Sequence, residues 1–284
     1  MNLNRIDRVN TVSRSYCAGE ITLDEAYEEL KQIHSKQYRR MSYNLATIFV
    51  CAGFAPLFQG GFPEIAGAAL AGIALALIMT VGKYLKINGF ILNVFSAFGI
   101  ALTAIFLQDL VPMVDMDIVI ISSIMPLVPG VAITYAIRDT LQGDYLSGAA
   151  RILEAFMTAT AIALGVGYRI CTDRNFTAGR WSVLNLLLGT VGSFVAIACF
   201  AVLLECPRKY LLHAGCVGAV GGGVYLFSMD LGLNVVLASF LSALVIALFS
   251  HTFARVFRAP VTIFLIPGIL PTVPGAGMYR SCIM

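Results

Sequence analysis

Long apolar runs separated by short polar stretches make up the chain from residue 41 onward. A helix needs about 20 mostly apolar residues to cross the hydrocarbon core of a bilayer. Backbone groups in lipid must be paired within their own segment, so such runs are expected to be helices, and no ten-residue alternating pattern indicates a membrane barrel. The pattern predicts an all-α polytopic membrane protein with about nine transmembrane helices, near residues 41–58, 64–82, 90–112, 118–137, 147–168, 183–204, 211–229, 231–250 and 260–279.

The first 40 residues follow a different pattern. They hold 13 of the 35 Lys, Arg, Asp and Glu residues and contain no long apolar run. Thr22 and Glu25 have the spacing of a capping box, in which each side chain accepts a hydrogen bond from the other residue's backbone N–H. Apolar residues then recur with a helical period at Leu23, Ala26, Tyr27, Leu30 and Ile33. Residues 1–40 are therefore predicted to be a cytosolic amphipathic helical segment, with no cleaved signal peptide.

Composition agrees with a location in the membrane. The chain is 58% hydrophobic and 12% charged, with a mean hydropathy of +0.84, whereas soluble domains carry about 25% charged residues. A formal net charge of +3, spread along the chain, does not suggest a nucleic-acid partner. The seven cysteines form no CxxC pair and have no histidine at ligand spacing, so they are interpreted as buried thiols and no metal or cofactor is expected.

Positive charges in the loops indicate an orientation. If all nine segments cross and residues 1–40 are cytoplasmic, eight later cations fall on the cytoplasmic side, namely Lys83, Lys86, Arg138, Arg151, Arg208, Lys209, Arg255 and Arg258. Four fall on the far side, at Arg169, Arg174, Arg180 and Arg280. If the fourth segment instead dips in and returns, the tally becomes six against six. The positive-inside rule therefore favours nine crossings and a cytoplasmic N-terminus.

Two stretches 146 residues apart resemble each other. NGFILNVFSAFGIAL, from Asn88, aligns with NVVLASFLSALVIAL, from Asn234, and each is followed by a PxVPG motif, at 126–130 and at 271–275. This indicates two related membrane units, residues 41–168 with five helices and residues 181–284 with four, the last helix of the second unit being absent. Because five crossings are an odd number, the second unit starts from the opposite face of the membrane. The predicted architecture is a pair of inverted-topology repeats, as in secondary transporters.

The PxVPG motifs are the candidate solute site. Proline lacks a backbone donor, so Pro126 and Pro129 are expected to release the carbonyls of Ser122 and Met125, and a new half-helix is expected to begin at Gly130. In the second unit, Pro271 and Pro274, followed by Gly275, are expected to release the carbonyls of Pro267 and Leu270. Free carbonyls suit an ammonium group and helix N-termini suit a carboxylate, so the pair would suit a zwitterion. The alternative is two proline kinks that only shape helix packing.

Glu154 is a candidate for proton coupling, because ionisable groups at depth in a membrane are costly and are often functional. The alternative is an ion pair with Arg151, three residues earlier on the same helix. Other carboxylates fall at predicted helix ends and are interpreted as solvated, namely Asp109, Asp115, Asp117, Glu205 and Asp230. Two glycine-dense stretches, at 66–72 and 214–223, occupy equivalent places in the two units and are interpreted as close helix-packing surfaces.

Three segments carry a resemblance to a known family. VNTVSRSYCAGEITLDEAYEEL, PLVPGVAITYAIRDTLQGDYLSGAARILEAF and FLIPGILPTVPGAGMYR resemble the threonine/serine exporter family. The resemblance implies an exporter of small amino acids, or in split-chain relatives of a small dicarboxylate, driven by the proton motive force in a bacterial cytoplasmic membrane. Family members carry a longer cytosolic domain and a tenth helix. This departure leaves a second reading, in which the chain is an incomplete subunit or scaffold that needs a partner chain or a second copy.

An intramembrane enzyme is the third function class. No GxSG serine, HExxH pair or EExxxR motif lies on a predicted span, and Glu28 and Glu29 lie in the polar head at the wrong depth. The sequence therefore predicts a transporter rather than an enzyme, with the lipid bilayer, a small solute and protons as its partners.

Overall fold

The computed structural model describes residues 2–33, 37–166 and 183–270, and every regular element in these ranges is a helix. The head and the first half contain α1 (Leu3–Cys17), α2 (Leu23–Lys31), α3 (Arg40–Phe54), the 3-10 helix η1 (Ala55–Phe58), α4 (Phe62–Tyr84), α5 (Gly89–Leu110), α6 (Met116–Ile124), α7 (Gly130–Leu141) and α8 (Tyr145–Val166). The second half contains α9 (Val183–Leu203), the 3-10 helix η2 (Arg208–Tyr210), α10 (Leu211–Asp230), α11 (Val235–Val256) and α12 (Thr262–Ile269).

Within the described ranges, seven helical segments are long and apolar enough to cross a membrane. They are α3 with η1, then α4, α5, α8 and α9, then η2 with α10, and finally α11. The fourth predicted span is divided into α6 and α7, and the ninth is described only as far as α12 and the residue after it. The chain is therefore a multi-pass helical membrane protein, and its nine crossings stay a prediction.

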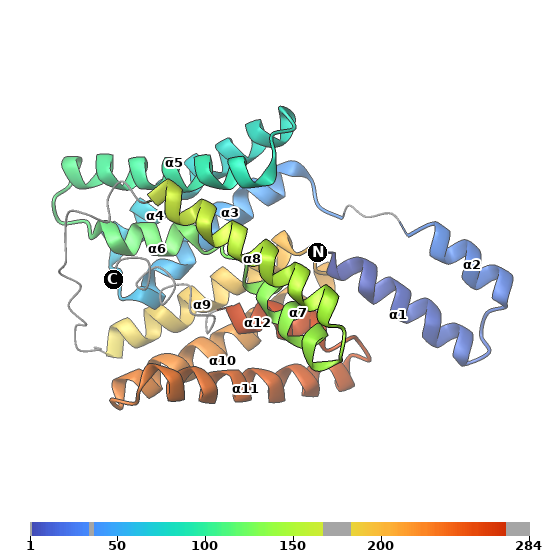
Figure 1. Cartoon of the computed structure of the whole chain (residues 1–284). Helices are drawn as coiled ribbons and strands as arrows, with labels where there is room; N and C mark the ends of the chain where they lie inside the picture. Colours follow the sequence, from blue (N-terminus) through green and yellow to red (C-terminus); the bar gives the residue numbers. More distant parts are fainter. Residues whose placement is uncertain (1, 34–36, 167–182, 271–284) are drawn as a thin grey trace.

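The head consists of α1 and α2, which project from one end of the bundle (Figure 1). The capping box that the sequence predicts is confirmed, since the Thr22 N–H donates to Glu25 Oε2 at 2.7 Å and the Glu25 N–H donates to Thr22 Oγ1 at 3.3 Å. The first turn of α1 is attached to the membrane helices: the Leu3 N–H donates to the Leu204 carbonyl at 3.0 Å and the Asn4 N–H to the Glu205 carbonyl at 2.8 Å. Leu3 is fully buried, so the head is anchored where it meets the bundle.

The proline motif of the first unit does interrupt its helix. α6 ends at Ile124 and α7 begins at Gly130. The Met125 carbonyl, which we expected to be free, accepts a hydrogen bond from the Val128 N–H at 3.3 Å, and that of Pro267 accepts one from the Leu270 N–H. Both carbonyls are thus paired, contrary to the prediction. The physical reason is that the last turn of a helix can tighten into 3-10 geometry. Its i→i+3 hydrogen bonds then pair carbonyls for which proline provides no donor.

The two halves pack their helices in the same order. In the first half, α4 packs against α3, α5 and α6, and α6 also packs against α3 and α5. In the second half, α10 packs against α9, α11 and α12, and α12 also packs against α9 and α11. The halves meet where α3 packs against α9. This correspondence agrees with an internal duplication, while the inverted direction of the second unit stays a prediction.

The glycine-dense stretches are packing surfaces, as predicted. A Cβ added at Gly72 on α4 would lie 3.0 Å from the Cα of Ile48 on α3. In the second half, a Cβ added at Gly215 on α10 would lie 3.0 Å from the ring of Phe194 on α9. Small residues therefore bring equivalent helix pairs into close contact in both halves.

Glu205 differs from its prediction as a solvated residue. Its side chain is buried and accepts hydrogen bonds from the Gln37 N–H at 3.0 Å and from the Tyr43 hydroxyl. Burial of a carboxylate is costly unless hydrogen bonds satisfy it, and here two donors supply them, one just before α3 and one in its first turn. Glu205 therefore joins the start of α3 to the end of α9.

Replacing Glu205 with glutamine should lower the free energy of unfolding by about 2 kcal/mol, because charge-assisted bonds to the carboxylate are lost and a new NH2 group faces a donor. Thermal unfolding of the purified protein in detergent measures this as a lower Tm. The control is Asp109→Asn at an exposed position, which should leave Tm unchanged. An equal Tm for both variants would show that the Glu205 contacts contribute nothing to stability.

Candidate functional site

A pocket of about 560 Å³ lies where α7 begins, beside the first half of α8. It is lined by Ile6, Leu127, Pro129, Val131, Ala132, Tyr135, Arg151, Glu154 and Thr158. Two sequence-predicted site residues, Pro129 and Glu154, thus line the same pocket. Gly130 lies between Pro129 and Val131 in the chain and is buried.

The α7–α8 hairpin brings these residues together. α7 and α8 pack against each other and are joined by a turn with Gly143 at φ 87° and a hydrogen bond of 2.9 Å from the Asp144 N–H to the Asp139 carbonyl. Glu154 follows the start of α8 by nine residues, which at 1.5 Å per residue is about 14 Å along the helix. That is roughly half of a hydrocarbon core about 30 Å thick. The start of α7 lies at a similar distance from the turn.

The first turn of α7 borders the pocket and has no side-chain cap. Its first intrahelical bond runs from the Ile133 N–H to the Pro129 carbonyl at 3.0 Å, and no side chain caps this end of the helix. The first N–H groups of a helix have no partner within it, and Val131 and Ala132, which line the pocket, belong to this first turn. This end of α7 also carries the positive end of the helix dipole.

Arg151 does not pair with Glu154, which was the alternative considered from the sequence. The Arg151 Nε donates to Asp139 Oδ2 at 2.9 Å, and its guanidinium carbon stands 5.3 Å from the centre of the Tyr135 ring. In the described ranges Glu154 forms no ion pair, and its side chain is exposed where it lines the pocket. Among the described residues, the pocket therefore holds a carboxylate without an ion-pair partner beside a guanidinium that is paired with Asp139.

The other predicted residues of the first motif lie outside this pocket. The Ser122 hydroxyl is fully buried and donates to the Ile118 carbonyl of its own helix at 2.7 Å. Met125 is buried and Pro126 is half-buried, and neither lines the pocket. In the second motif, Pro271, Pro274 and Gly275 lie outside the described residues.

Of the nine residues given above for this pocket, sequence reasoning named only Pro129 and Glu154 as site residues, and Ile6, Arg151 and Tyr135 are among those it missed. Ile6 reaches it from the head, and no local signal links α1 to a site more than 120 residues further on. Arg151 was weighed only as a partner of Glu154, whereas its partner Asp139 lies twelve residues away across the hairpin. The Gly143–Asp144 turn was the available signal, because a tight turn between two helical patterns predicts that they pack side by side. Tyr135 lies one turn after Val131 and faces the same way.

Comparison with known proteins agrees with these features. A family model described as "Putative threonine/serine exporter" matches residues 1–170, which is more than half of the chain. The chain belongs to the threonine/serine exporter family. A second model, described as "Threonine/Serine exporter, ThrE", matches residues 189–284. The two models meet near the boundary between the two halves described above.

Two curated relatives of this exporter family match nearly the whole chain. A "Threonine/serine exporter" of Corynebacterium glutamicum is 24% identical over 99% of this chain and 60% of its own length. A "Probable threonine/serine exporter" of Mycobacterium tuberculosis is 21% identical over 98% of this chain and 55% of its own length. The chain thus spans somewhat more than half the length of these relatives. No solved structure matches it.

Proposed function

We propose that the protein is a secondary transporter that exports small amino acids of the threonine and serine type, coupled to the proton motive force. It would reside in a bacterial cytoplasmic membrane with its N-terminus in the cytoplasm. One observation carries this proposal: a single pocket brings together the first turn of α7, Glu154 and Arg151. The two relatives, which are described as threonine/serine exporters, support the solute class.

The chemistry of the pocket suits an α-amino acid. The free N–H groups at the start of α7 and the Arg151 guanidinium are donors for the solute carboxylate. Glu154 is an acceptor for the solute ammonium group, and it can take up a proton once that group has left. Exchange of solute for proton at one carboxylate is a simple means of coupling the two fluxes. Thr158 and Tyr135 add hydroxyl groups along the same wall.

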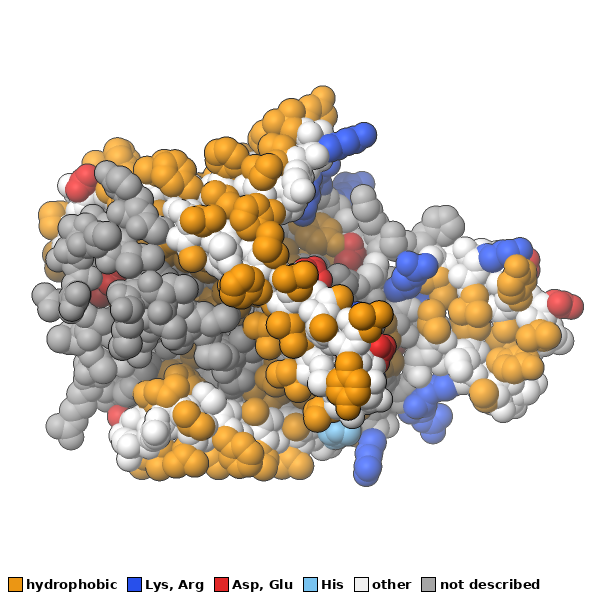
Figure 2. Space-filling view, in the orientation of Figure 1, with side chains coloured by type: hydrophobic (Ala, Val, Ile, Leu, Met, Phe, Trp, Pro, Cys, Tyr) orange, Lys and Arg blue, Asp and Glu red, His pale blue; other side chains and the backbone are white. Residues whose placement is uncertain are grey.

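The distribution of charge supports the proposed orientation. On the visible face, Lys and Arg side chains lie toward the end that carries the head, while Asp and Glu appear at the opposite end as well (Figure 2). In Figure 1, α6 begins at the end of the bundle opposite the head, and the turn after α7 lies on the side of the head. If the broken helix α6–α7 crosses the membrane within two inverted repeats, α6 should start and α7 should end on opposite sides. The cations should then gather on the cytoplasmic side.

A small dicarboxylate is the second candidate solute, and Arg151 favours it because a guanidinium binds carboxylates in a planar, bidentate manner. Counterflow in proteoliposomes, with labelled amino acids and dicarboxylates tested in turn, decides between the two. Uptake of threonine or serine supports the proposal, and uptake of dicarboxylates alone contradicts it. Counterflow that appears only after a partner chain is added would favour the reading as an incomplete subunit.

The double variant Pro126→Ala with Pro271→Ala tests whether the interrupted helices form the path of the solute through the protein. Alanine at 126 restores the backbone donor for the Ser122 carbonyl, so α6 can extend toward Pro129 and shorten the interruption ahead of α7. The variant should fold and insert, but threonine counterflow should fall to background. Pro63→Ala in the first turn of α4, where proline is tolerated, is the control and should transport normally. Normal flux in the double variant would refute a role for the breaks in transport.

A further inference from the structure

The ion pair that joins α7 to α8 stands at the edge of the solute pocket. Arg151 lines the pocket, whereas Asp139, in the last turn of α7, does not. The Arg151 Nε donates to Asp139 Oδ2 at 2.9 Å, and the Asp139 side chain is only 19% exposed. Water therefore screens this pair less than it screens two fully exposed charges. Asp139 thus holds the guanidinium of the pocket from outside the pocket.

The packing of the hairpin sets this contact. α7 and α8 approach closely at Gly148, where an added Cβ would lie 3.1 Å from the Ala136 carbonyl oxygen. Asp139 follows Ala136 by three residues and Arg151 follows Gly148 by three, so both side chains leave from the faces on which the two helices touch. The position of Asp139 beside Arg151 is therefore fixed by the backbones of both helices.

The same guanidinium keeps donors for a ligand. A guanidinium group has five N–H donors, of which Asp139 receives the one on Nε. The Tyr135 ring, also on α7, lies 5.3 Å from the guanidinium carbon. Asp139 and Tyr135 thus hold Arg151 against α7 and leave its terminal NH2 groups for a solute carboxylate.

Glu154 lies within reach of Arg151 on α8. It follows Arg151 by three residues, a spacing at which opposite charges on a helix surface form ion pairs. Both residues line the pocket, yet Glu154 forms no ion pair in the described ranges. If Asp139 lost its charge, Glu154 would be the next carboxylate available to Arg151.

Arg151 is the only cation among the described residues that line this pocket. On α7, Tyr135 is the titratable residue of the lining, and Arg138 is exposed outside it. On α5, which also packs against α8, Asp109 in the last turn is the one charged residue. The choice of Glu154 between a free and a paired state thus depends on Arg151.

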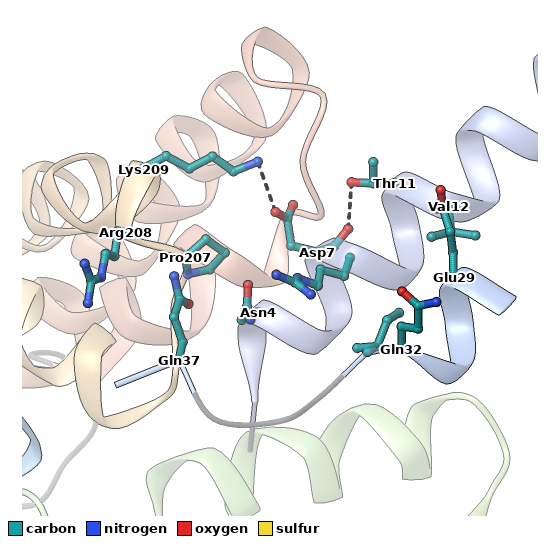
Figure 3. A pocket seen from close by; sticks show the side chains of 12 residues that line it. Asn4, Asp7, Thr11, Val12, Glu29, Gln32, Gln37, Pro207, Arg208 and Lys209 are labelled. Atoms are coloured by element: carbon teal, nitrogen blue, oxygen red, sulfur yellow. Dashed lines mark hydrogen bonds and ion pairs between the residues drawn. The ribbon is translucent and has the colours of Figure 1, made fainter. Parts of the chain in front are cut away.

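The charged residues of the head next to Ile6 line a different cavity (Figure 3). This cavity, of about 630 Å³, lies between the head and residues 207–209. Asp7 pairs there with Lys209 at 3.1 Å, and Arg8 and Arg208 border it as well. None of these four residues lines the solute pocket. Among the described residues, the head therefore contributes the apolar Ile6 and no charge to the lining around Glu154.

We infer that Asp139 is a positioning residue, which holds Arg151 on the α7 side of the pocket and thereby keeps Glu154 free. The inference rests on the proposed function, in which Glu154 receives the ammonium group of the solute and the proton. Without Asp139, Arg151 and Glu154 would pair with each other. A zwitterion would then have to break that pair before it could bind.

Labelling of Glu154 by a hydrophobic carbodiimide tests the inference without any solute. The reagent reacts with protonated carboxyl groups, and peptide mass spectrometry of the full chain in lipid nanodiscs measures the labelled fraction over a range of pH. Asp139→Asn should lower labelling of Glu154 about two- to fivefold at a given pH, since a pair with Arg151 favours the charged carboxylate. In an Arg151→Gln background, Asp139→Asn should have no further effect.

Asp144→Asn is the matched control. It removes one negative charge from the same hairpin, and asparagine can still cap α8 as Asp144 does through its bond from the Ser147 N–H at 3.4 Å. Asp139→Glu, which keeps a carboxylate beside Arg151, is the rescue variant. Both should label Glu154 as the wild type does.

The outcomes separate this inference from the proposed function. Equal labelling in Asp139→Asn and Asp144→Asn would overturn the inference, as would a loss that persists in the Arg151→Gln background. Absence of labelling at Glu154 in the wild type at every pH would also overturn it. Threonine counterflow tests the proposed function separately. If counterflow is absent while labelling follows the expected pattern, the proposed function fails and the positioning of Arg151 by Asp139 stands.

Discussion

Glutamine in place of Glu154 should abolish the response of export to a pH gradient. The substitution keeps the shape of the side chain but removes its negative charge and its ability to take up a proton. It also removes the proposed acceptor for the solute ammonium group, a charge-assisted bond of about 1.5–3 kcal/mol. Solute affinity should therefore fall by about tenfold to a hundredfold. Export from proteoliposomes, measured with and without an imposed pH gradient, gives both quantities.

Folding should not be affected by this change, because no ion pair to Glu154 is present in the described ranges and its side chain lines a pocket. An unchanged Tm would separate a transport defect from a folding defect. Glu20→Gln in the head, at an exposed position outside both pockets, is the control and should behave as the wild type. If Glu154→Gln still exports faster when the pH gradient is imposed, Glu154 is not the coupling group.

The largest effect on stability is expected at Gly192, where α9 crosses α3. A Cβ at Gly192 would lie 2.6 Å from the Gly53 carbonyl oxygen and 3.1 Å from the Pro56 side chain. A Cβ at Gly53 would in turn lie 2.8 Å from the Ala196 nitrogen. Backbone atoms cannot move aside as a flexible side chain does, so any side chain here must separate the two helices that join the halves.

Gly192→Leu should therefore reduce stability by about 3 kcal/mol or more, at or beyond the upper end of the usual cost of overpacking. The expected results are a low yield of monodisperse protein and a clearly lower Tm in detergent. Gly223→Ala on α10 is the matched control, since its nearest neighbours are ordinary contacts at 3.4 and 3.5 Å on Thr190. It should be neutral or stabilising by about 0.5–1 kcal/mol, as alanine is a better helix former. A normal Tm for Gly192→Leu would rule out the close α3–α9 crossing.

Local features were predicted well from the sequence. The capping box at Thr22 and Glu25, the helix break between Ser122 and Gly130, and the packing role of the glycine-dense stretches all appear in the structure. Each depends on residues within about a turn or two of one another, or on the small size of a side chain. Such properties are set by the chain itself and need no knowledge of its neighbours.

The errors have a different origin. Glu205 was expected to be solvated because it follows an apolar run, but segments from more than 160 residues away bury it and donate to it. The Met125 carbonyl was expected to be free because Pro129 cannot donate to it, but the chain tightened locally and Val128 supplied the donor. Arg151 was paired in sequence reasoning with its nearest carboxylate on the helix, whereas the hairpin brought Asp139 to it.

The sequence alone established a helical membrane protein with a polar head, an interrupted helix at a PxVPG motif and a likeness between two halves, because hydrophobic period, proline and glycine act over short distances. Only the tertiary structure decided that Glu154 shares a pocket with the start of α7 and with Ile6 from the head, and that Arg8 and Arg208 border a second cavity. Both results depend on contacts between helices far apart in the chain. Apolar periodicity predicts that one face of a helix is buried, but it does not predict which segment of the chain packs against that face.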